Sequence, residues 1–310
     1  MRLSVVIVNW NTGDLIRSCV ESVYADLAAY ADLPDGETEV FVVDSASTDG
    51  STPAVQAQFP DAIYIYSPQN IGFGPSNNLA LRQAMGDYIL LLNPDTLVQP
   101  GAIQTLLRFM EQHPQAGAAA ARLLNPDGSL QYSCSPEPTL KGEFLRLFHL
   151  GSVRPDGYYP METWDLATSR PVEVILGACM LVRKTVLDQV GLFDERFFMY
   201  NEETDLCHRI RQDGWQIYWV PQAQVTHYGG HSTRQIAAEM FVQLYRAKIT
   251  YFRKYHSPLT VGLYKLVLFL TGLPRLALAP VASLERAGQG EKHRAIAANY
   301  QRLLRALPGL

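Results

Sequence analysis

The sequence contains few cysteines, and none of them lie close together. The four cysteines are Cys19, Cys134, Cys179 and Cys207, and they form no C-x-x-C pair. Zinc sites and disulfide frameworks need cysteines at short or regular spacings. The pattern therefore argues against both kinds of site and fits a reducing compartment.

The chain also has no recognisable export signal, internal repeat or low-complexity segment. The apolar stretch Leu3–Val8 is shorter than the hydrophobic segment of a signal peptide, and Asn9-Trp10-Asn11 ends it. We therefore expect a first β-strand here and a protein that stays in the cytoplasm.

Apolar residues, by contrast, are plentiful. Of the 310 residues, 47% are hydrophobic and 18% are charged, which is typical of a globular protein with a sizeable core. At about 150 residues per domain, this length predicts one large α/β domain or two smaller ones.

The net charge of −4 is distributed unevenly. From Arg246 onward there are 11 Lys or Arg and 2 Asp or Glu, a net charge of +9, whereas the preceding residues hold 15 and 28, a net charge of −13. A basic segment on an acidic body indicates an anionic partner for that segment. The segment is also rich in Leu, Val and Phe, which favours an anionic membrane surface over nucleic acid.

The strongly apolar stretch Leu259–Leu284 raises the question of a membrane span. Lys265 and Arg275 interrupt it, and we expect Pro274 to break or kink a helix near its middle. A span needs about 20 largely uncharged residues, so helices lying on the membrane surface fit better. Their apolar face would consist of Leu263, Leu266, Val267 and Leu270. The alternative is that these helices pack onto the rest of the protein or form a homodimer interface.

Short apolar runs alternate with helical patterns in the first part of the chain. The predicted strands are Leu3–Val8, Val40–Val43, Ile63–Tyr66, Tyr88–Leu92 and Gly117–Leu123. The predicted helices are Asp14–Leu27, Pro75–Met85 and Gly101–Gln112. Near-continuous apolar strands separated by helices indicate a mostly parallel, Rossmann-like α/β sheet covered on both faces. In such sheets ligands bind beyond the carboxyl ends of the strands.

Periodicity weakens from Asn125 to Pro171, where we predict only a helix at Leu140–His149. Regular patterns then return as a strand at Val172–Val182, a helix at Glu202–Gln212 and a strand at Gln216–Val220.

Two of these strands end in acidic side chains. Asp44 follows the second strand, where a carboxylate can accept a hydrogen bond from a pyrimidine N3–H or a ribose hydroxyl. Asp95 follows the fourth strand, where it can hold Mg²⁺ or Mn²⁺ against a diphosphate. Ser and Asp at such positions are equally typical of helix caps and turns, so each signal is ambiguous alone.

Two further polar clusters lie later in the chain. Glu202, Glu203 and Asp205 fall in the first turn of a predicted helix, where the helix dipole favours acids whatever their role. Asp205 and Arg209 are also spaced for an ordinary i,i+4 ion pair. The same dipole keeps a carboxylate ionised, as a general base must be. His227 follows a strand and could ligate a metal, although a single histidine is more often structural.

Taken in order, these segments resemble the family 2 glycosyltransferases of the GT-A fold, and especially their rhamnosyltransferase-like branch. The resemblance spans roughly residues 1–235 and rests on VVIVNWN, DSASTDGS, NIGFGPSNNLAL, GDYILLLNPDT, GACMLVRK, FDERFFMYNEETDLCHRI and THYGGHST. It implies a GT-A domain over 1–235, with a nucleotide-binding half (1–98) and an acceptor-binding half (99–235). A basic, apolar helical extension (236–310) would follow.

The resemblance also implies roles for particular residues. The donor nucleotide would be bound by Asn9, Asn11, Asp44, Asn70, Gly72 and Asn77. Asp95, in the position of the family's metal-binding acid, and His227 would ligate the metal, beside Asn93. Gly177 and Ala178 would border the sugar pocket, and Glu203 would be the catalytic base.

Three positions depart from the family pattern. Ser45 stands where Asn is common, and Asn93 replaces the first acid of the Asp-x-Asp form, which leaves Asp95 alone to supply charge to the metal. Glu203 replaces the usual Asp of the base position, so Asp205 is an alternative base.

We therefore expect an inverting, metal-dependent glycosyltransferase of cell-surface polysaccharide synthesis, on the inner face of the cell membrane. It would move a sugar from a nucleotide-diphosphate donor to a saccharide or polyprenyl-diphosphate-linked acceptor. The branch makes dTDP-rhamnose the leading donor, with N-acetylglucosamine, galactofuranose and glucose left open.

Two other classes of protein are weighed against this expectation. A sugar nucleotidyltransferase would need a glycine- and lysine-rich loop after the first strand, where this chain has Asn9-Trp10-Asn11-Thr12. A non-catalytic nucleotide-sugar-binding protein remains an alternative because of Asn93 and Glu203.

Overall fold

The structure is a computed structural model that describes residues 2–29, 38–150, 159–277 and 289–310. The chain divides into two compact units, each taken by itself below. The first consists of Met1–Glu137, Pro160–Phe198 and Glu202–Arg234, and the second of Pro138–Tyr159, Met199–Asn201 and Gln235–Leu310.

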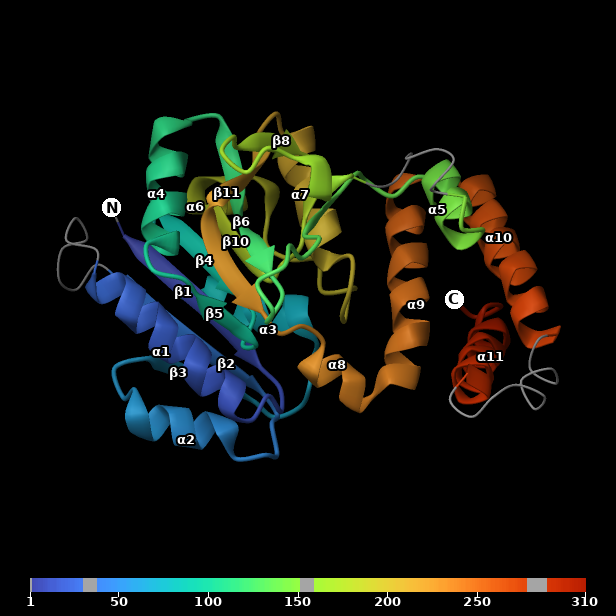
Figure 1. Cartoon of the computed structure of the whole chain (residues 1–310), viewed down its shortest axis with the longest axis horizontal. Helices are drawn as coiled ribbons and strands as arrows, with labels where there is room; N and C mark the ends of the chain where they lie inside the picture. The colour runs from blue at the N-terminus through green and yellow to red at the C-terminus, as the bar shows by residue number, and fades with distance from the viewer. Residues whose placement is uncertain (1, 30–37, 151–158, 278–288) are drawn as a thin grey trace. The chain divides into compact units, whose positions relative to one another are not determined.

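A nine-stranded sheet forms the centre of the first unit (Figure 1). Its strands are β1 (Leu3–Asn9), β2 (Thr38–Ser45), β3 (Ile63–Ser67), β4 (Tyr88–Leu92), β5 (Thr96–Val98), β6 (Ala116–Leu124), β8 (Arg170–Val172), β10 (Cys179–Arg183) and β11 (Gln216–His227). They follow the order β3-β2-β1-β4-β10-β6-β11-β5, with β8 paired to β11. A separate pair joins β7 (Cys134–Ser135) to β9 (Val174–Ile175).

The sheet is mostly parallel, with antiparallel strands at its centre and beside β11. Strands β1 to β4 are parallel to one another, and β6 is parallel to β11, whereas β5 and β8 run antiparallel to β11. Strand β10 runs antiparallel to both β4 and β6 and thereby joins the two parallel sets. The prediction of a mostly parallel sheet is confirmed, and the carboxyl ends of β1, β2 and β4 meet at one edge.

Helices cover the sheet on both faces. They are α1 (Asp14–Ala28), α2 (Ser51–Gln58), α3 (Phe73–Leu81), α4 (Ala102–Gln112), α6 (Lys184–Val190), α7 (Glu202–Gln212) and, at the end of the unit, α8 (His231–Gln235), with a 3₁₀ turn at Met161–Thr163. Helices α1 and α4 pack on one face, and α3 contacts β1, β2 and α7.

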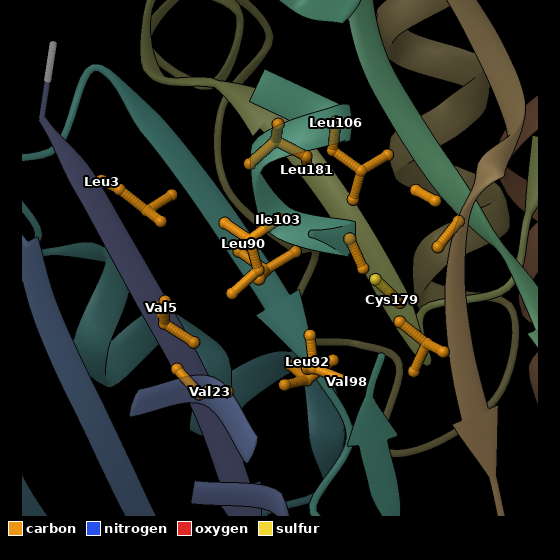
Figure 2. Packing of buried hydrophobic residues seen from close by; sticks show 14 of the residues in the cluster. Leu3, Val5, Val23, Leu90, Leu92, Val98, Ile103, Leu106, Cys179 and Leu181 are labelled. Atoms are coloured by element: carbon orange, nitrogen blue, oxygen red, sulfur yellow. The ribbon is translucent and has the colours of Figure 1, made fainter. Parts of the chain in front are cut away.

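The main core lies between the sheet and helices α1 and α4. Figure 2 shows Leu90 and Leu181 of adjacent strands beside Ile103 and Leu106 of α4, with Val23 of α1 near Val5. Burying each such side chain contributes about 1.5–3 kcal/mol. Because the central strands are covered on both faces, they are apolar at almost every position, as the sequence pattern indicated.

Two predicted strand boundaries are wrong. The expected strand Val172–Val182 is divided into β8, β9 and β10, because the chain leaves the nine-stranded sheet after Val172, pairs with β7 at Val174–Ile175 and re-enters the sheet at Cys179. Strand β11 was expected to end at Val220, before Pro221, but it continues to His227. A shift of register between Val220 and Gln224 accommodates the proline.

Four helices make up most of the second unit: α5 (Leu140–Leu147), α9 (Ala237–Tyr255), α10 (Pro258–Ala277) and α11 (Gln289–Ala306). Their apolar core includes Phe252, Tyr264, Leu268 and Leu303. Buried inside it, Glu143 accepts from Tyr264 Oη at 3.2 Å and pairs with Arg146 at 2.7 Å and with Lys248. Burial alone would raise the pKa of Glu143, but the two cations lower it to about 2.

Helix α10 carries large apolar side chains on both its inner and its outer face. Val261, Tyr264 and Leu268 pack inward. The expected break at Pro274 is wrong, because the helix continues through this residue in its last turn. Six large side chains on the outer face are 42–73% exposed: Leu259, Leu263, Leu266, Phe269, Leu270 and Leu273. The expected face included Val267, which instead packs partly against the core.

By length and composition, α10 is also the one helix in the described parts of the chain that could cross a membrane. Residues 278–284 of the predicted apolar stretch lie outside the described residues.

Candidate active site

Asn9 connects the loops that follow the first two strands. Its side chain is buried at the end of β1, beside Asp44 at the end of β2. The Asn9 amide donates to Thr52 Oγ1 at 2.7 Å and Ser51 Oγ at 2.9 Å, and its oxygen accepts from Thr12. These bonds use the amide's hydrogen-bonding capacity within the protein, so Asn9 shapes the loops around the predicted base pocket.

The loop after β2 is folded around its own polar groups. Asp44 Oδ1 accepts from the Ser47 amide at 2.7 Å, and Asn11 Oδ1 accepts from the Thr48 amide at 2.7 Å. Asp44 still has a second carboxylate oxygen as an acceptor. This arrangement agrees with both readings of the sequence, a turn and a donor-binding carboxylate. The nucleotide-binding roles of Asp44 and Asn11 stay predictions.

The Asn70–Gly74 loop is held against the backbone near Phe198. Gly72 has φ +90°, and a Cβ built there would lie 1.9 Å from the Phe198 carbonyl oxygen, so no other residue fits without a shift. The next amide, of Phe73, donates to that oxygen at 2.8 Å. Nearby, Asn77 Nδ2 donates to the Phe73 carbonyl, while its buried Oδ1 has no hydrogen-bond partner in the described structure. Gly72 is therefore explained by packing, and the donor-binding role predicted for this loop is untested.

The two predicted metal ligands, Asp95 and His227, lie in direct contact. His227 Nε2 is 3.2 Å from Asp95 Oδ1, and both side chains are 8% exposed. The pair forms because β5, directly after Asp95, runs antiparallel to the end of β11. Burial alone would raise the pKa of Asp95, but its hydrogen bond to His227 and the charge of that ring lower it below the ordinary value.

Gln131, which the sequence did not single out, orients the His227 ring. Its amide nitrogen donates to Asn125 Oδ1 and to the His227 carbonyl, so its oxygen is the atom that faces His227 Nδ1, at 2.6 Å. Nδ1 therefore carries a proton, and Nε2 is the nitrogen that points at Asp95 and at Asn93 Nδ2, 3.3 Å away. Metal-ligating histidines usually donate the N–H of their other ring nitrogen to an oxygen acceptor, as Nδ1 does here to Gln131.

The donor set at this point suits a divalent cation shared with a substrate. The described residues contain no group of three His, Cys, Asp or Glu side chains placed for a metal, so the protein offers the two ligands Asp95 and His227. Mg²⁺ is commonly held by one or two carboxylates with substrate phosphates and water completing its shell. The residues fit a cation that binds together with a diphosphate.

The acids at the start of α7 differ in exposure. Glu203 is partly exposed, whereas Glu202 is buried with one carboxylate oxygen unpartnered. Burial raises the pKa of Glu203 to about 7, and burial together with the charge of Glu203 raises the pKa of Glu202 well above its ordinary value. Two adjacent carboxyls whose proton affinities are raised in this way are typical of acid–base sites.

Asp205 has a different environment. It is fully buried and pairs with Arg209 Nε at 2.9 Å, the i,i+4 pair indicated by the sequence. Arg209 also donates to the carbonyls of Val190, Gly191 and Leu192. These contacts tie α7 to the loop after α6. They also leave Asp205 out of reach of the hydroxyl group of an acceptor substrate.

Gly177 and Ala178 connect the metal pair to Glu203. The Asn93 amide donates to the Ala178 carbonyl at 3.0 Å, and a Cβ at Gly177 would lie 3.7 Å from Glu203 Cβ. Asn93, Asp95, His227 and Glu203 therefore converge at one edge of the sheet, next to the loops of Asn9 and Asp44. A bound diphosphate sugar would lie between a cation site and a carboxylate of raised pKa.

The chain is similar to known proteins over most of its length. Residues 4–191 match the family model Glycosyl transferase family 2. This chain belongs to glycosyltransferase family 2. Over 274 residues, covering 82% of this chain and 85% of the relative, it is 30% identical to the N-acetylglucosaminyl-diphospho-decaprenol L-rhamnosyltransferase of Mycobacterium tuberculosis. It is also 32% identical to rhamnosyltransferase WbbL of Escherichia coli K12, covering 55% of this chain and 66% of the relative. The resemblance to the rhamnosyltransferase-like branch is confirmed.

Solved structures show the same fold. The mannosyltransferase PcManGT from Pyrobaculum calidifontis, in complex with GDP-Man and Mn²⁺, matches this glycosyltransferase with a TM-score of 0.53 and 18% identity. The match covers 98% of this chain and 87% of that one.

Proposed function

We propose that this glycosyltransferase is an inverting, metal-dependent rhamnosyltransferase of cell-surface polysaccharide synthesis. The donor would be dTDP-rhamnose and the acceptor a polyprenyl-diphosphate-linked N-acetylglucosamine. The observation that carries the proposal is the convergence of Asp95, His227 and Glu203 at one sheet edge. The named activity of the mycobacterial relative, which is similar over most of both chains, supports the sugar and the acceptor.

Each residue of the candidate site has a separate role in the proposed reaction. Asp95 and His227 Nε2 would hold Mg²⁺ or Mn²⁺, which when bound supplies positive charge against the leaving diphosphate. Asp44 accepts a hydrogen bond from the thymine N3–H or a ribose hydroxyl. Glu203 takes the proton from the acceptor hydroxyl as that oxygen attacks the anomeric carbon. The new glycosidic bond forms as the bond to the diphosphate breaks on the opposite face, so the configuration inverts.

Glu203 suits this role better than Asp205. A general base must reach the proton it removes, and its pKa should lie near the working pH. Glu203 is partly exposed and has a pKa raised to about 7, whereas Asp205 is fully buried against Arg209. A substitution of Asp by the longer Glu is thus compatible with the role.

We further propose that the second unit holds the enzyme on the inner face of the cell membrane. The outer face of α10 presents six large apolar side chains, and the chain from Arg246 onward carries a net charge of +9. An apolar face with basic residues is typical of helices that lie on an anionic membrane. A polyprenyl-linked acceptor would be met at that surface.

The direct test is transfer by the purified protein. We expect rhamnose to move from dTDP-rhamnose to a short-chain polyprenyl-diphospho-N-acetylglucosamine in the presence of Mn²⁺, and NMR of the product to show inverted anomeric configuration. UDP-N-acetylglucosamine and GDP-mannose are tested in parallel as comparison donors. Binding of dTDP-rhamnose without any transfer would instead support a non-catalytic nucleotide-sugar-binding protein. Preferred use of another donor would reassign the sugar.

A further inference from the structure

The first unit contains a pocket of about 430 Å³ that is lined by none of the residues assigned to the reaction above. It lies between the ends of β6 and β11 and the segment that begins with the 3₁₀ turn. Its walls are formed by Arg122, Leu124, Gly128, Leu130, Met161, Glu162, Trp164, Leu166 and Gln224. This volume falls in the range of small-molecule binding pockets.

Arg122 is the first sign that the pocket has a ligand. Its Nε is buried and makes no hydrogen bond in the described structure. Arg183 of this unit, by contrast, donates to three backbone carbonyls and to a tyrosine hydroxyl. Among the described residues, Arg170 Nε, whose guanidinium lies over Trp164, is the other buried arginine nitrogen of this unit without a partner. A buried donor without a partner is unfavourable, so a ligand that supplies an acceptor would stabilise Arg122. Gln224 lies next to it, since the two residues are paired across β6 and β11.

Trp164 gives the pocket a fixed aromatic wall. The Arg170 guanidinium lies 4.5 Å from the ring centroid, and the buried Trp219 meets the ring edge-on at 5.1 Å. Leu124, Leu130 and Met161 add further apolar surface. The pocket thus combines flat apolar walls with a few planar polar groups.

We propose that this pocket binds a saccharide unit of the acceptor, an inference that rests on the proposed transferase function. A sugar presents an apolar ring face to Trp164 and hydroxyl groups that both donate and accept. It can therefore accept from Arg122 Nε and hydrogen-bond with the Gln224 amide, and it can donate to Glu162, which also accepts from Tyr132 Oη. A purely anionic ligand would fit less well, because Glu162 would repel it.

The pocket is connected to the reaction site by one short hairpin. Gly128 and Leu130 line the pocket, and the following residue, Gln131, holds the His227 ring and carbonyl. A saccharide bound against this hairpin would be positioned relative to the metal pair. The pocket would thereby determine how tightly the acceptor sugar binds, while Asp95, His227 and Glu203 carry out the chemical step.

The proposal can be tested by binding in the absence of donor and metal. In saturation-transfer NMR with N-acetylglucosamine, we expect the wild-type protein to saturate the sugar resonances. Arg122→Met and Gln224→Leu should abolish this signal, and the control Arg17→Met, at an exposed position of α1, should retain it. Because Arg122 Nε has no hydrogen-bond partner among the described residues, Arg122→Met should keep or raise Tm. In the transfer assay the same variant should raise the acceptor KM at least fivefold with an unchanged donor KM.

Several results would overturn the saccharide assignment. One is an unchanged sugar signal in Arg122→Met. Another is a lower Tm of this variant with normal sugar binding and a normal acceptor KM. Both results would mean that Arg122 has a structural role. Inorganic phosphate that binds at Arg122 and displaces no sugar would mean an anion site. If dTDP-rhamnose raises Tm and is used but no sugar binds at the pocket, only this inference fails. If the donor neither binds nor reacts, the proposed function fails.

Discussion

His227 Nε2 lies 3.2 Å from Asp95 Oδ1, although the two residues come from strands far apart in the sequence. The antiparallel pairing of β5 with the end of β11 brings them together, and Gln131 orients the ring so that Nε2 faces the carboxylate. The carboxylate oxygen of Asp95 and the imidazole nitrogen of His227, held together in a buried position, are suited to a divalent cation.

Loss of either ligand should therefore remove metal binding. In Asp95→Asn and His227→Gln we expect Mn²⁺ to raise Tm no longer, whereas at 100 times Kd it should stabilise the wild type by about 2.7 kcal/mol. Transfer should be severely reduced in both variants. His113→Gln, a histidine at the end of α4, serves as the control. Full transfer in EDTA would contradict the metal role.

Gln131→Leu should weaken the metal without removing a ligand. The substitution leaves Nδ1 of His227 without its acceptor, and outer contacts of this kind typically contribute 10–100-fold to metal affinity. We expect a rise in the Mn²⁺ Kd of that order, measured by titration, and partial rescue by Gln131→Glu, which keeps an acceptor oxygen. Equal Mn²⁺ affinity in the leucine variant and the wild type would assign Gln131 a purely structural role.

Glu203→Gln should cut kcat by about 10²–10⁴ with little change in donor KM, because it removes basicity and keeps size. Asp205→Asn should act on stability instead. It breaks a buried ion pair with Arg209, a change that typically costs about 3–5 kcal/mol. Stopped assays and urea unfolding of both variants separate the two effects. The opposite result, with kcat lost in Asp205→Asn and retained in Glu203→Gln, would make Asp205 the base.

The raised pKa of Glu203 predicts how activity depends on pH. Burial raises this pKa to about 7, and a base acts in its deprotonated form, so kcat/KM should rise as pH increases through about 7 and then level off. The measurements should be made at saturating Mn²⁺, so that occupancy of the metal site does not change with pH. The residual activity of Glu203→Gln should lack this rise. A wild-type profile that is already flat from pH 5 would show that Glu203 is ionised there and not perturbed.

The apolar face of α10 should carry membrane binding. Replacing Leu263, Leu266 and Leu270 together by Gln should abolish flotation with anionic vesicles, whereas Met85→Gln, at an exposed position of the first unit, should not. Wild-type binding should weaken with salt, because each basic residue near the surface contributes up to about 1 kcal/mol. Retention of the protein on the membrane after high salt and alkaline extraction would indicate a span by α10. Failure to bind vesicles at low salt would contradict both arrangements.

Much of the first unit could be read from local patterns. The parallel strands are buried on both faces, so β1, β2 and β4 appear in the sequence as unbroken apolar runs that end in Asn9, Asp44 and Asn93. The strand boundaries after Val172 could not be read in this way. They depend on how the chain leaves the nine-stranded sheet after Val172 to pair β9 with β7, and on a bulge that lets β11 continue past Pro221.

The sequence by itself determined the alternation of strands and helices, the edge at which polar side chains gather and the i,i+4 pair of Asp205 and Arg209. Each of these depends on periodicity or spacing within one segment. Only the tertiary structure decided that Gln131 orients His227, that Gly72 is required by the Phe198 carbonyl and that Arg122 faces a pocket without a partner. Those relationships join distant segments, and their energies arise from close packing and buried polar groups that local sequence patterns do not encode.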